Sequence, residues 1–460
     1  RGVLRLMASV IHALWEKEDR GLLIMPSSIP IDDAAVSFEL LRYMSENWEG
    51  VVSKDIDGEQ SLPLSLDREN PNFGRYSACR RVARSVFMAS APLIKSGNPG
   101  IDARVVKLSC SWPGETVATF GDALRLLSDR ATYLYVDGSR AWYDTTPNVT
   151  RTAQDRANQL KPEDVDAYIT SILKTENQGA AKRGMFAGLH VTPEDAADVP
   201  DEMDTRLVIF DPNKPHKRGN QQSAAIIAAE HYLSQRGASP RIFKNSLIFM
   251  APDEARLEDL RTAARQYLAW KSVVNDEESL NLTAFSKNQA KTKRDDSART
   301  VQTRLHETWI WGLVPTQGPE GGVVTWDDIK VAGDDALGIK IAKKLVEQGT
   351  LYQVLGPAVL KHYLDNWLWK DIDFISVSKL REYLATYLYL PRITGQGVLA
   401  TTIETALTEL IQEYFGFADG VSVEDDKTTY VGLKITNVGL VSVTGNSVIV
   451  KPDIAKAVVE

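Results

Sequence analysis

Hydrophobic residues recur at intervals of three and four along much of the chain, the spacing that puts them on one face of a helix. The opening segment, RGVLRLMASVIHALWEKEDRG, has this spacing throughout, and Gly21 follows it as a C-cap candidate. A second helix is predicted over residues 33–48. Between them, the apolar residues 22–25 predict a short buried strand. The polar residues 53–73 predict a surface loop or linker.

Three helices and a β-hairpin are predicted after Gly74. The first helix begins in GRYSACRRVARSVFMASA, the second begins at Ile101, and the third runs from about Thr119 through Arg130. Strand-forming residues then flank Asp137-Gly138, a two-residue hairpin signal. Three helices followed by a hairpin is the order of a winged-helix module, with the third helix in the place of a recognition helix.

The middle of the chain alternates between strand and helix patterns. The apolar runs LVIFDP (207–212) and SLIFMAPD (246–253) predict buried strands, each followed by helical sequence, which favours a small α/β layer with parallel strands. Residues 286–304 have six Lys or Arg, two Asp and few apolar residues, and predict a flexible connector or one long exposed helix. From Thr325 to about Phe415 the pattern predicts a helical region with four helices, and a β-rich tail follows.

Composition limits the function classes. The chain has 53 Lys plus Arg against 61 Asp plus Glu, a net charge of −8, so nucleic-acid binding needs a local basic patch. Two cysteines, neither in a CxxC pair, favour a reducing compartment, and both stand in apolar helical contexts that predict burial. No signal peptide and no apolar run of about 20 residues is found. We therefore expect a cytoplasmic protein without a membrane partner.

No self-contained catalytic motif is found in the sequence. A GxxxxGK[ST] phosphate loop, HExxH, GxSxG and paired CxxC motifs are all absent, and no metal ligand set has the required spacing. Asp211 and Asp253 follow the two predicted strands, where a turn or a helix cap is the favoured role. The alternative is a hydrolase that uses the two carboxylates with a divalent metal. His216 lies in a basic turn and is expected to be solvated.

Two groups of basic residues are candidates for DNA binding. In the predicted winged helix, Arg125, Arg130 and Arg140 could contact phosphates, although Asp122, Asp129 and Asp137 alternate with them. Winged helices also serve as protein-binding modules. The second group lies in the basic connector and comprises Lys291, Lys293 and Arg294. A third cluster, Arg80, Arg81 and Arg84, is expected to form salt bridges with the acidic residues of the neighbouring segment 53–73.

Several longer strings resemble one family. They are RGVLRLMASVIHALW, SACRRVARSVF, FGDALRLLSDRATYLYVDGSRAWYDTTPNVTRTAQDRA, NSLIFMAPDEARLEDLRTAARQYLAWKSV, GDDALGIKIAKKLVEQGTLYQVLGP and REYLATYLYLPRI. This family comprises large bacterial and archaeal AAA+-like ATPases with a domain of unknown function, encoded beside DNA methyltransferases and helicases in phage-defence islands.

The resemblance implies that a nucleotide-binding core lies upstream. The chain starts at Arg1 rather than Met and has no Gly-Lys dipeptide, so we expect ATP and Mg²⁺ to bind in that core and no cofactor, metal or catalytic residue in this chain. By analogy with AAA+ lids, Arg1 or Arg5 could reach a nucleotide phosphate as a sensor.

The expected protein is multidomain, of the α+β and α/β classes, and helix-rich. The expected domains are a lid-like helical segment (1–60), a winged-helix module (74–150), a helical segment with the α/β layer (151–285), the basic connector (286–324) and a helical or second winged-helix region with a β-rich tail (325–460). Its expected function is that of an accessory region, which couples the nucleotide state of the core to DNA or to a partner enzyme such as the methyltransferase or helicase. The alternative is a protein–protein scaffold that makes no contact with nucleic acid. Whether the chain by itself is an enzyme is left open.

Overall fold

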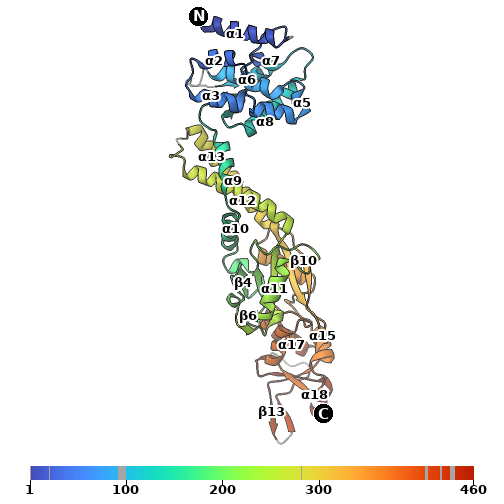
Figure 1. The fold of residues 1–460 in the computed structure, drawn as a ribbon. Helices are drawn as coiled ribbons and strands as arrows, with labels where there is room; N and C mark the ends of the chain where they lie inside the picture. Colours follow the sequence, from blue (N-terminus) through green and yellow to red (C-terminus); the bar gives the residue numbers. More distant parts are fainter. Residues whose placement is uncertain are drawn as a thin grey trace. The chain divides into compact units, whose positions relative to one another are not determined.

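The computed structural model describes residues 2–19, 21–91, 100–280, 282–409, 413–424, 427–435 and 441–459. The chain divides into two compact units, which are Arg1–Leu160 with Leu268–Asp295, and Lys161–Tyr267 with Asp296–Glu460. Each unit contains helices together with small β-sheets (Figure 1). The expected helix-rich, mixed α and β class is therefore confirmed.

The first unit is built around one central helix, α6 (Ala78–Ser90). The α6 side chains Val82, Val86 and Phe87 are buried in a hydrophobic core shared with the helices around them. These helices are α2 (Ala34–Leu41), α3 (Asn47–Val51), α4 (Leu62–Glu69), α5 (Pro71–Gly74), α7 (Ala103–Cys110) and α8 (Val117–Arg130). Helix α1 (Gly2–Glu16) forms a smaller core with α2, and α9 (Val149–Gln159) ends this part of the chain.

A three-stranded antiparallel sheet completes the first unit. Its strands are β1 (Ile101–Asp102), β2 (Leu134–Asp137) and β3 (Arg140–Tyr143), and β3 lies between the other two. The hairpin predicted at Asp137-Gly138 is confirmed, and Gly138 has a φ of +55°, which favours glycine. The order is α6, β1, α7, α8, β2 and β3, with a short strand before the second predicted helix.

Three predictions for the first unit are wrong. The single helix predicted over residues 33–48 is two helices, α2 and α3, because residues 42–46 are not helical. Residues 22–25 form no strand, and Leu22 is 93% exposed rather than buried. Residues 53–73 are not a surface loop but include most of a π-helix (Val52–Ile56), helix α4 and most of α5. Their polar composition misled the prediction because Asp57 and Asp67 are buried and accept hydrogen bonds from α6.

The second unit contains a five-stranded mixed sheet with the order β10-β9-β8-β5-β4. Strands β4, β5 and β8 pair in parallel, and β9 and β10 pair antiparallel. Their bounds are Gly188–Val191, Arg206–Ile209, Leu247–Pro252, Trp309–Thr316 and Thr325–Lys330, in chain order. The two predicted strands with parallel pairing, β5 and β8, are confirmed.

The sequence pattern missed part of this sheet. No strand was expected over β4 or β9, and the helical region expected from Thr325 begins instead with strand β10. All but the last residue of β9 are buried, and β9 lies between β8 and β10 in the sheet. A continuous apolar run such as Trp309–Val314 does not show by its periodicity which structure it forms.

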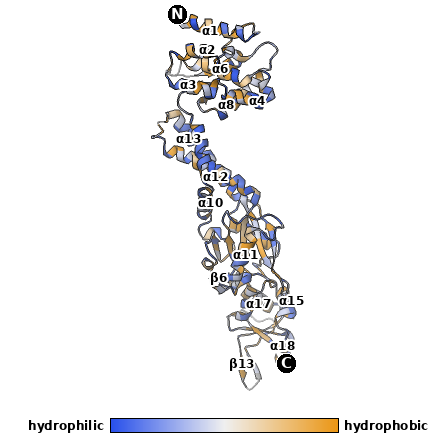
Figure 2. Cartoon of the chain, in the orientation of Figure 1, coloured by the Kyte–Doolittle hydropathy of each residue, from blue (hydrophilic) through white to orange (hydrophobic). Residues whose placement is uncertain are grey.

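Helices precede and follow the parallel strands. They are α10 (Pro162–Glu176), α11 (Ala224–Ser234), α12 (Glu254–Asn275) and α13 (Ala284–Thr308). Figure 2 shows α11 largely in the colour of hydrophobic residues, and its buried side chains join the core of the sheet. The basic residues 286–304 all lie in α13, so of the two structures expected there the long helix is present.

The C-terminal part contains the four predicted helices. They are α14 (Leu337–Glu347), α15 (Pro357–Tyr363) with a following π-helix (Leu364–Leu368), α16 (Val377–Thr386) and α17 (Gln396–Thr408). Strands β11 (Phe374–Ser376), β12 (Gly416–Ala418) and β15 (Val448–Val450) form an antiparallel sheet with β15 in the middle. Hairpin β13 (Gly420–Glu424) and β14 (Lys427–Val431), helix α18 (Pro452–Val459) and the small pair β6 (Gln235–Arg236) and β7 (Ser239–Pro240) complete the fold.

Candidate functional site

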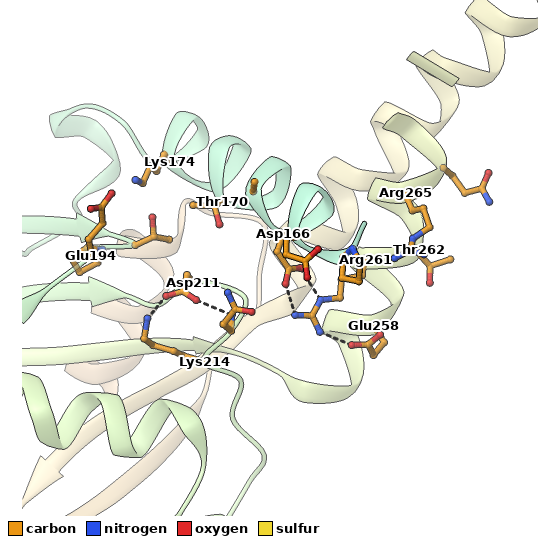
Figure 3. Close-up of a pocket in the computed structure, with 17 residues that line it drawn as sticks. Asp166, Thr170, Lys174, Glu194, Asp211, Lys214, Glu258, Arg261, Thr262 and Arg265 are labelled. Atoms are coloured by element: carbon orange, nitrogen blue, oxygen red, sulfur yellow. Dashed lines mark hydrogen bonds and ion pairs between the residues drawn. The ribbon is translucent and has the colours of Figure 1, made fainter. Parts of the chain in front are cut away.

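A cavity of about 1100 Å³ lies beside the carboxyl ends of strands β4 and β5. The loops that follow these two strands form one part of its wall, and helices α10 and α12 form the rest (Figure 3). Ligands of α/β proteins commonly bind at this edge of a parallel sheet. The cavity is therefore the candidate site. Its charged residues are Glu163, Asp166, Lys174, Glu194, Asp211, Lys214, Glu258, Arg261 and Arg265.

Ion pairs connect the walls of the cavity. The Arg261 guanidinium of α12 donates two hydrogen bonds of 2.8 Å to the Asp166 carboxylate of α10 and a third, of 2.6 Å, to Glu258 (Figure 3). These hydrogen bonds outweigh partial burial and raise the pKa of Arg261 above its ordinary value. Asp211 pairs with Lys214 in the loop after β5. Lys174 and Arg265 have no ion-pair partner among the described residues, so the cavity suits a polar, charged molecule.

Thr192, the first residue after β4, is strained. Its φ is +48°, in the left-handed region that a β-branched residue rarely adopts, and its buried hydroxyl has no hydrogen-bond partner among the described residues. Strain of this kind is concentrated at functional sites. No sequence pattern indicated a role for Thr192, because a Thr-Pro pair after an unrecognised strand is a weak signal.

Asp211 and Asp253 do not converge on one site. Only Asp211 lines the cavity, where it accepts a hydrogen bond from the backbone N–H of Asn213. Asp253 accepts the N–H of Arg256 at the start of α12 and the indole N–H of Trp311. The favoured turn and capping roles are therefore present. Among the described residues, no group of three or more His, Cys, Asp or Glu side chains could hold a metal ion.

His216 is buried, so the expectation of a solvated side chain is wrong. Its Nδ1 lies 2.8 Å from Ser223 Oγ and its Nε2 lies 3.4 Å from Asp328 Oδ2. Although this set resembles a hydrolytic triad, Ser223 is itself buried and its Oγ accepts the N–H of Ile226 as the cap of α11. Burial lowers the pKa of His216 although Asp328 opposes the shift. The contacts of His216 with Ser223 and Asp328 therefore connect the loop after β5 with strand β10.

The DNA-binding candidates of the first unit are engaged in contacts within the protein. Arg125 pairs with Asp122 at 3.5 Å, and Arg130 pairs with Glu69 at 3.4 Å. Arg140 donates a hydrogen bond to the carbonyl of Gly100.

The candidates in α13 are also partly paired. Lys291 pairs with Glu277 at 3.2 Å and Arg294 with its neighbour Asp295 at 2.7 Å, whereas Lys293 is exposed. The sensor candidate Arg5 is exposed on α1, and Arg1 lies outside the described residues.

The salt bridges predicted between α6 and the acidic residues of segment 53–73 are present for Arg80 and Arg84 but not for Arg81. Arg80 and Arg84 pair with Asp57, and Arg81 pairs with Glu115. Both cysteines, Cys79 and Cys110, are free and fully buried, as predicted.

No protein-family model, curated protein or solved structure matches the chain. Within the described ranges, no helix is long and apolar enough to cross a membrane.

Proposed function

We propose that the chain is a partner-binding accessory part of an ATPase of the family that it resembles, and that it carries two winged-helix domains on either side of the five-stranded sheet in the sequence. The first domain has the order α6, β1, α7, α8, β2, β3. The second has the order π-helix, β11, α16, α17, β12, β15, with the pair β13 and β14 inserted between β12 and β15. In both sheets the third strand lies between the first and the second. This shared topology supports the proposal of two related domains.

The exposed apolar face of α1 supports the proposal that the chain binds another protein. Leu4, Ile11 and Trp15 lie at helical spacing on one side of α1, and each exposes more than half of its surface. The opposite side, with Val10 and Ala13, is buried against α2. Apolar patches of this kind commonly mark protein-binding surfaces. The partner in this proposal is the DNA methyltransferase or helicase encoded beside such ATPases, and binding follows the nucleotide state of an ATP- and Mg²⁺-dependent core.

The charge of the two candidate recognition helices favours a protein partner over duplex DNA. The exposed charged residues of α8 are Asp122, Arg125, Asp129 and Arg130, two acids and two bases. The described part of α17 has no Lys or Arg. Duplex binding depends on an excess of cations that displace counterions from phosphate, which neither helix supplies. DNA binding through Arg125, Arg130 and Arg140 stays a competing prediction.

Co-purification with the neighbouring methyltransferase or helicase tests the proposal. We expect nuclease-resistant capture of one of these enzymes by the intact chain, lost on the double substitution Leu4→Ser and Trp15→Ser and retained on the control His12→Ala. Salt-dependent duplex binding that is lost when Arg125, Arg130 and Arg140 become Ala would favour DNA instead. Failure of both enzymes to bind would reject the protein partner.

A further inference from the structure

Four aromatic side chains form a continuous row on the C-terminal part of the second unit. The rings of Tyr383 and Tyr387 have centroids 5.5 Å apart, and those of Tyr387 and Tyr389 are stacked at the same distance. Tyr389 then meets Trp367 edge-on at 6.1 Å. The residues come from α16, from the segment after it and from the π-helix after α15, so the row joins separate elements.

The row is partly open to solvent. Trp367 and Tyr387 are 39% and 40% exposed, whereas Tyr383 and Tyr389 are half-buried and pack on the hydrophobic core beneath them. A set of aromatic side chains that only filled the core would be covered, as Phe415 and Phe417 are in the same part of the chain. The core therefore supports the row from one side, and part of Trp367 and of Tyr387 is open to solvent.

A lysine lies at each end of the row. The ammonium of Lys370 is 5.2 Å from the centre of the Trp367 ring, and that of Lys379 is 5.0 Å from the centre of the Tyr383 ring. Both lysines are exposed, and Lys379 also pairs with Glu382 at 2.8 Å. The exposed acids Asp371 and Asp373 follow Lys370 in sequence. The row thus has two cations but no large excess of positive charge.

We propose that this row, Tyr383, Tyr387, Tyr389 and Trp367 with Lys370 and Lys379, binds single-stranded nucleic acid. Unpaired bases stack on aromatic rings regardless of sequence, and flanking cations hold the phosphates of the same strand. Duplex DNA keeps its bases stacked inside the helix and cannot use such a surface.

A proline-rich peptide is the other occupant that an aromatic surface can accept. Such peptides place proline rings in grooves between aromatic side chains. Here Tyr387 and Tyr389 are stacked with an interplanar angle of 28°, so no groove separates their rings. A lysine at each end also complements phosphates rather than an uncharged polyproline helix. These two observations favour nucleic acid, independently of the function proposed above.

Fluorescence anisotropy with a labelled oligothymidylate and with a duplex of equal length tests this inference on the full chain. We expect the single strand to bind more tightly than the duplex. Tyr387→Ala and Trp367→Ala should each weaken binding by about fivefold to 150-fold, the loss expected when one base no longer stacks on an aromatic ring. Tyr387→Phe, which keeps the ring, should bind normally, and so should Tyr43→Ala, which removes an exposed tyrosine of the first unit.

Two charge variants provide a test that does not depend on removing a ring. Lys370→Glu should weaken single-strand binding, whereas Glu382→Gln should strengthen it because Lys379 loses the carboxylate that competes with phosphate. With two phosphates neutralised, the logarithm of the binding constant should fall with the logarithm of salt concentration with a slope of about −1.4. Absence of single-strand binding, preference for a proline-rich peptide, or affinity unchanged by both alanine variants would overturn the inference.

Discussion

The carboxylate of Asp57 and the guanidinium of Arg80 form a buried ion pair in the first unit, with Oδ1 and Nη2 2.7 Å apart and the Asp57 side chain fully covered. The other carboxylate oxygen pairs with Arg84, at 2.6 Å. Burial acts to lower the pKa of Arg80, but Asp57 and Asp32 raise it above its ordinary value. These ion pairs hold the segment that contains Asp57 against the central helix α6.

Asp57→Asn should destabilise the first unit strongly. The substitution removes one charge of a buried network and leaves Arg84, whose side chain is 12% exposed, without its nearest partner. Removal of one partner from a buried ion pair costs about 3–5 kcal/mol of unfolding free energy. Hydrogen exchange at the amides of α6 measures the loss. Asp122→Asn, which removes an exposed partner of Arg125, is the matched control and should leave exchange unchanged.

Gly338→Ala should destabilise the second unit. A Cβ at this position of α14 would lie 2.5 Å from the carbonyl oxygen of Lys182, a backbone atom that cannot easily move. Gly397→Ala is the control, because that helical position of α17 is open and alanine favours helix over glycine. We expect Gly338→Ala to lower the thermal midpoint by several degrees and Gly397→Ala to leave it equal or slightly higher. Equal thermal midpoints for the wild type and Gly338→Ala would show that the backbones at Gly338 and Lys182 are not this close.

The second unit should lose stability in acid through His190. Burial, with Arg206 and Arg241 nearby, lowers the pKa of His190 from 6.5 to about 4. Because the fold favours the neutral ring, its contribution is complete above about pH 6.5 and is lost as the pH falls towards 4. His190→Gln should therefore reduce the dependence of urea stability on pH between 4 and 6.5. A variant with the slope of the wild type would contradict this assignment.

Both cysteines should resist alkylation in the native protein. Cys79 and Cys110 are fully buried, and burial raises the pKa of each thiol, that of Cys110 to about 11. The reactive thiolate is therefore scarce and covered near neutral pH. Mass spectrometry after brief treatment with N-ethylmaleimide at pH 7 should show no adduct, and two adducts should form in denaturant. Rapid modification of the folded chain would place at least one thiol at the surface.

Local sequence patterns predicted an element correctly where one strong signal determined the backbone conformation. The hairpin at Asp137-Gly138, helix α14 and the parallel strands β5 and β8 follow from turn chemistry, helical spacing and continuous apolar runs. The salt bridges of Arg80 and Arg84 with the neighbouring acidic segment were also predicted, whereas the partner of Arg81, Glu115, was not. Strand β9 was not predicted, because a short apolar run between other elements is compatible with both a helix and a strand.

The sequence by itself determined the mixed class, the hairpin and most of the helices, because these depend on neighbouring residues. Only the tertiary structure decided that His216 is buried against Ser223 and Asp328, 112 residues away, and that the carboxyl ends of β4 and β5 border a cavity with the strained Thr192. Likewise, only the fold brings Trp367 into the row formed by Tyr383, Tyr387 and Tyr389. Whether a side chain is buried, and with which residue it pairs, depends on contacts between residues far apart in the sequence, and local sequence does not determine those contacts.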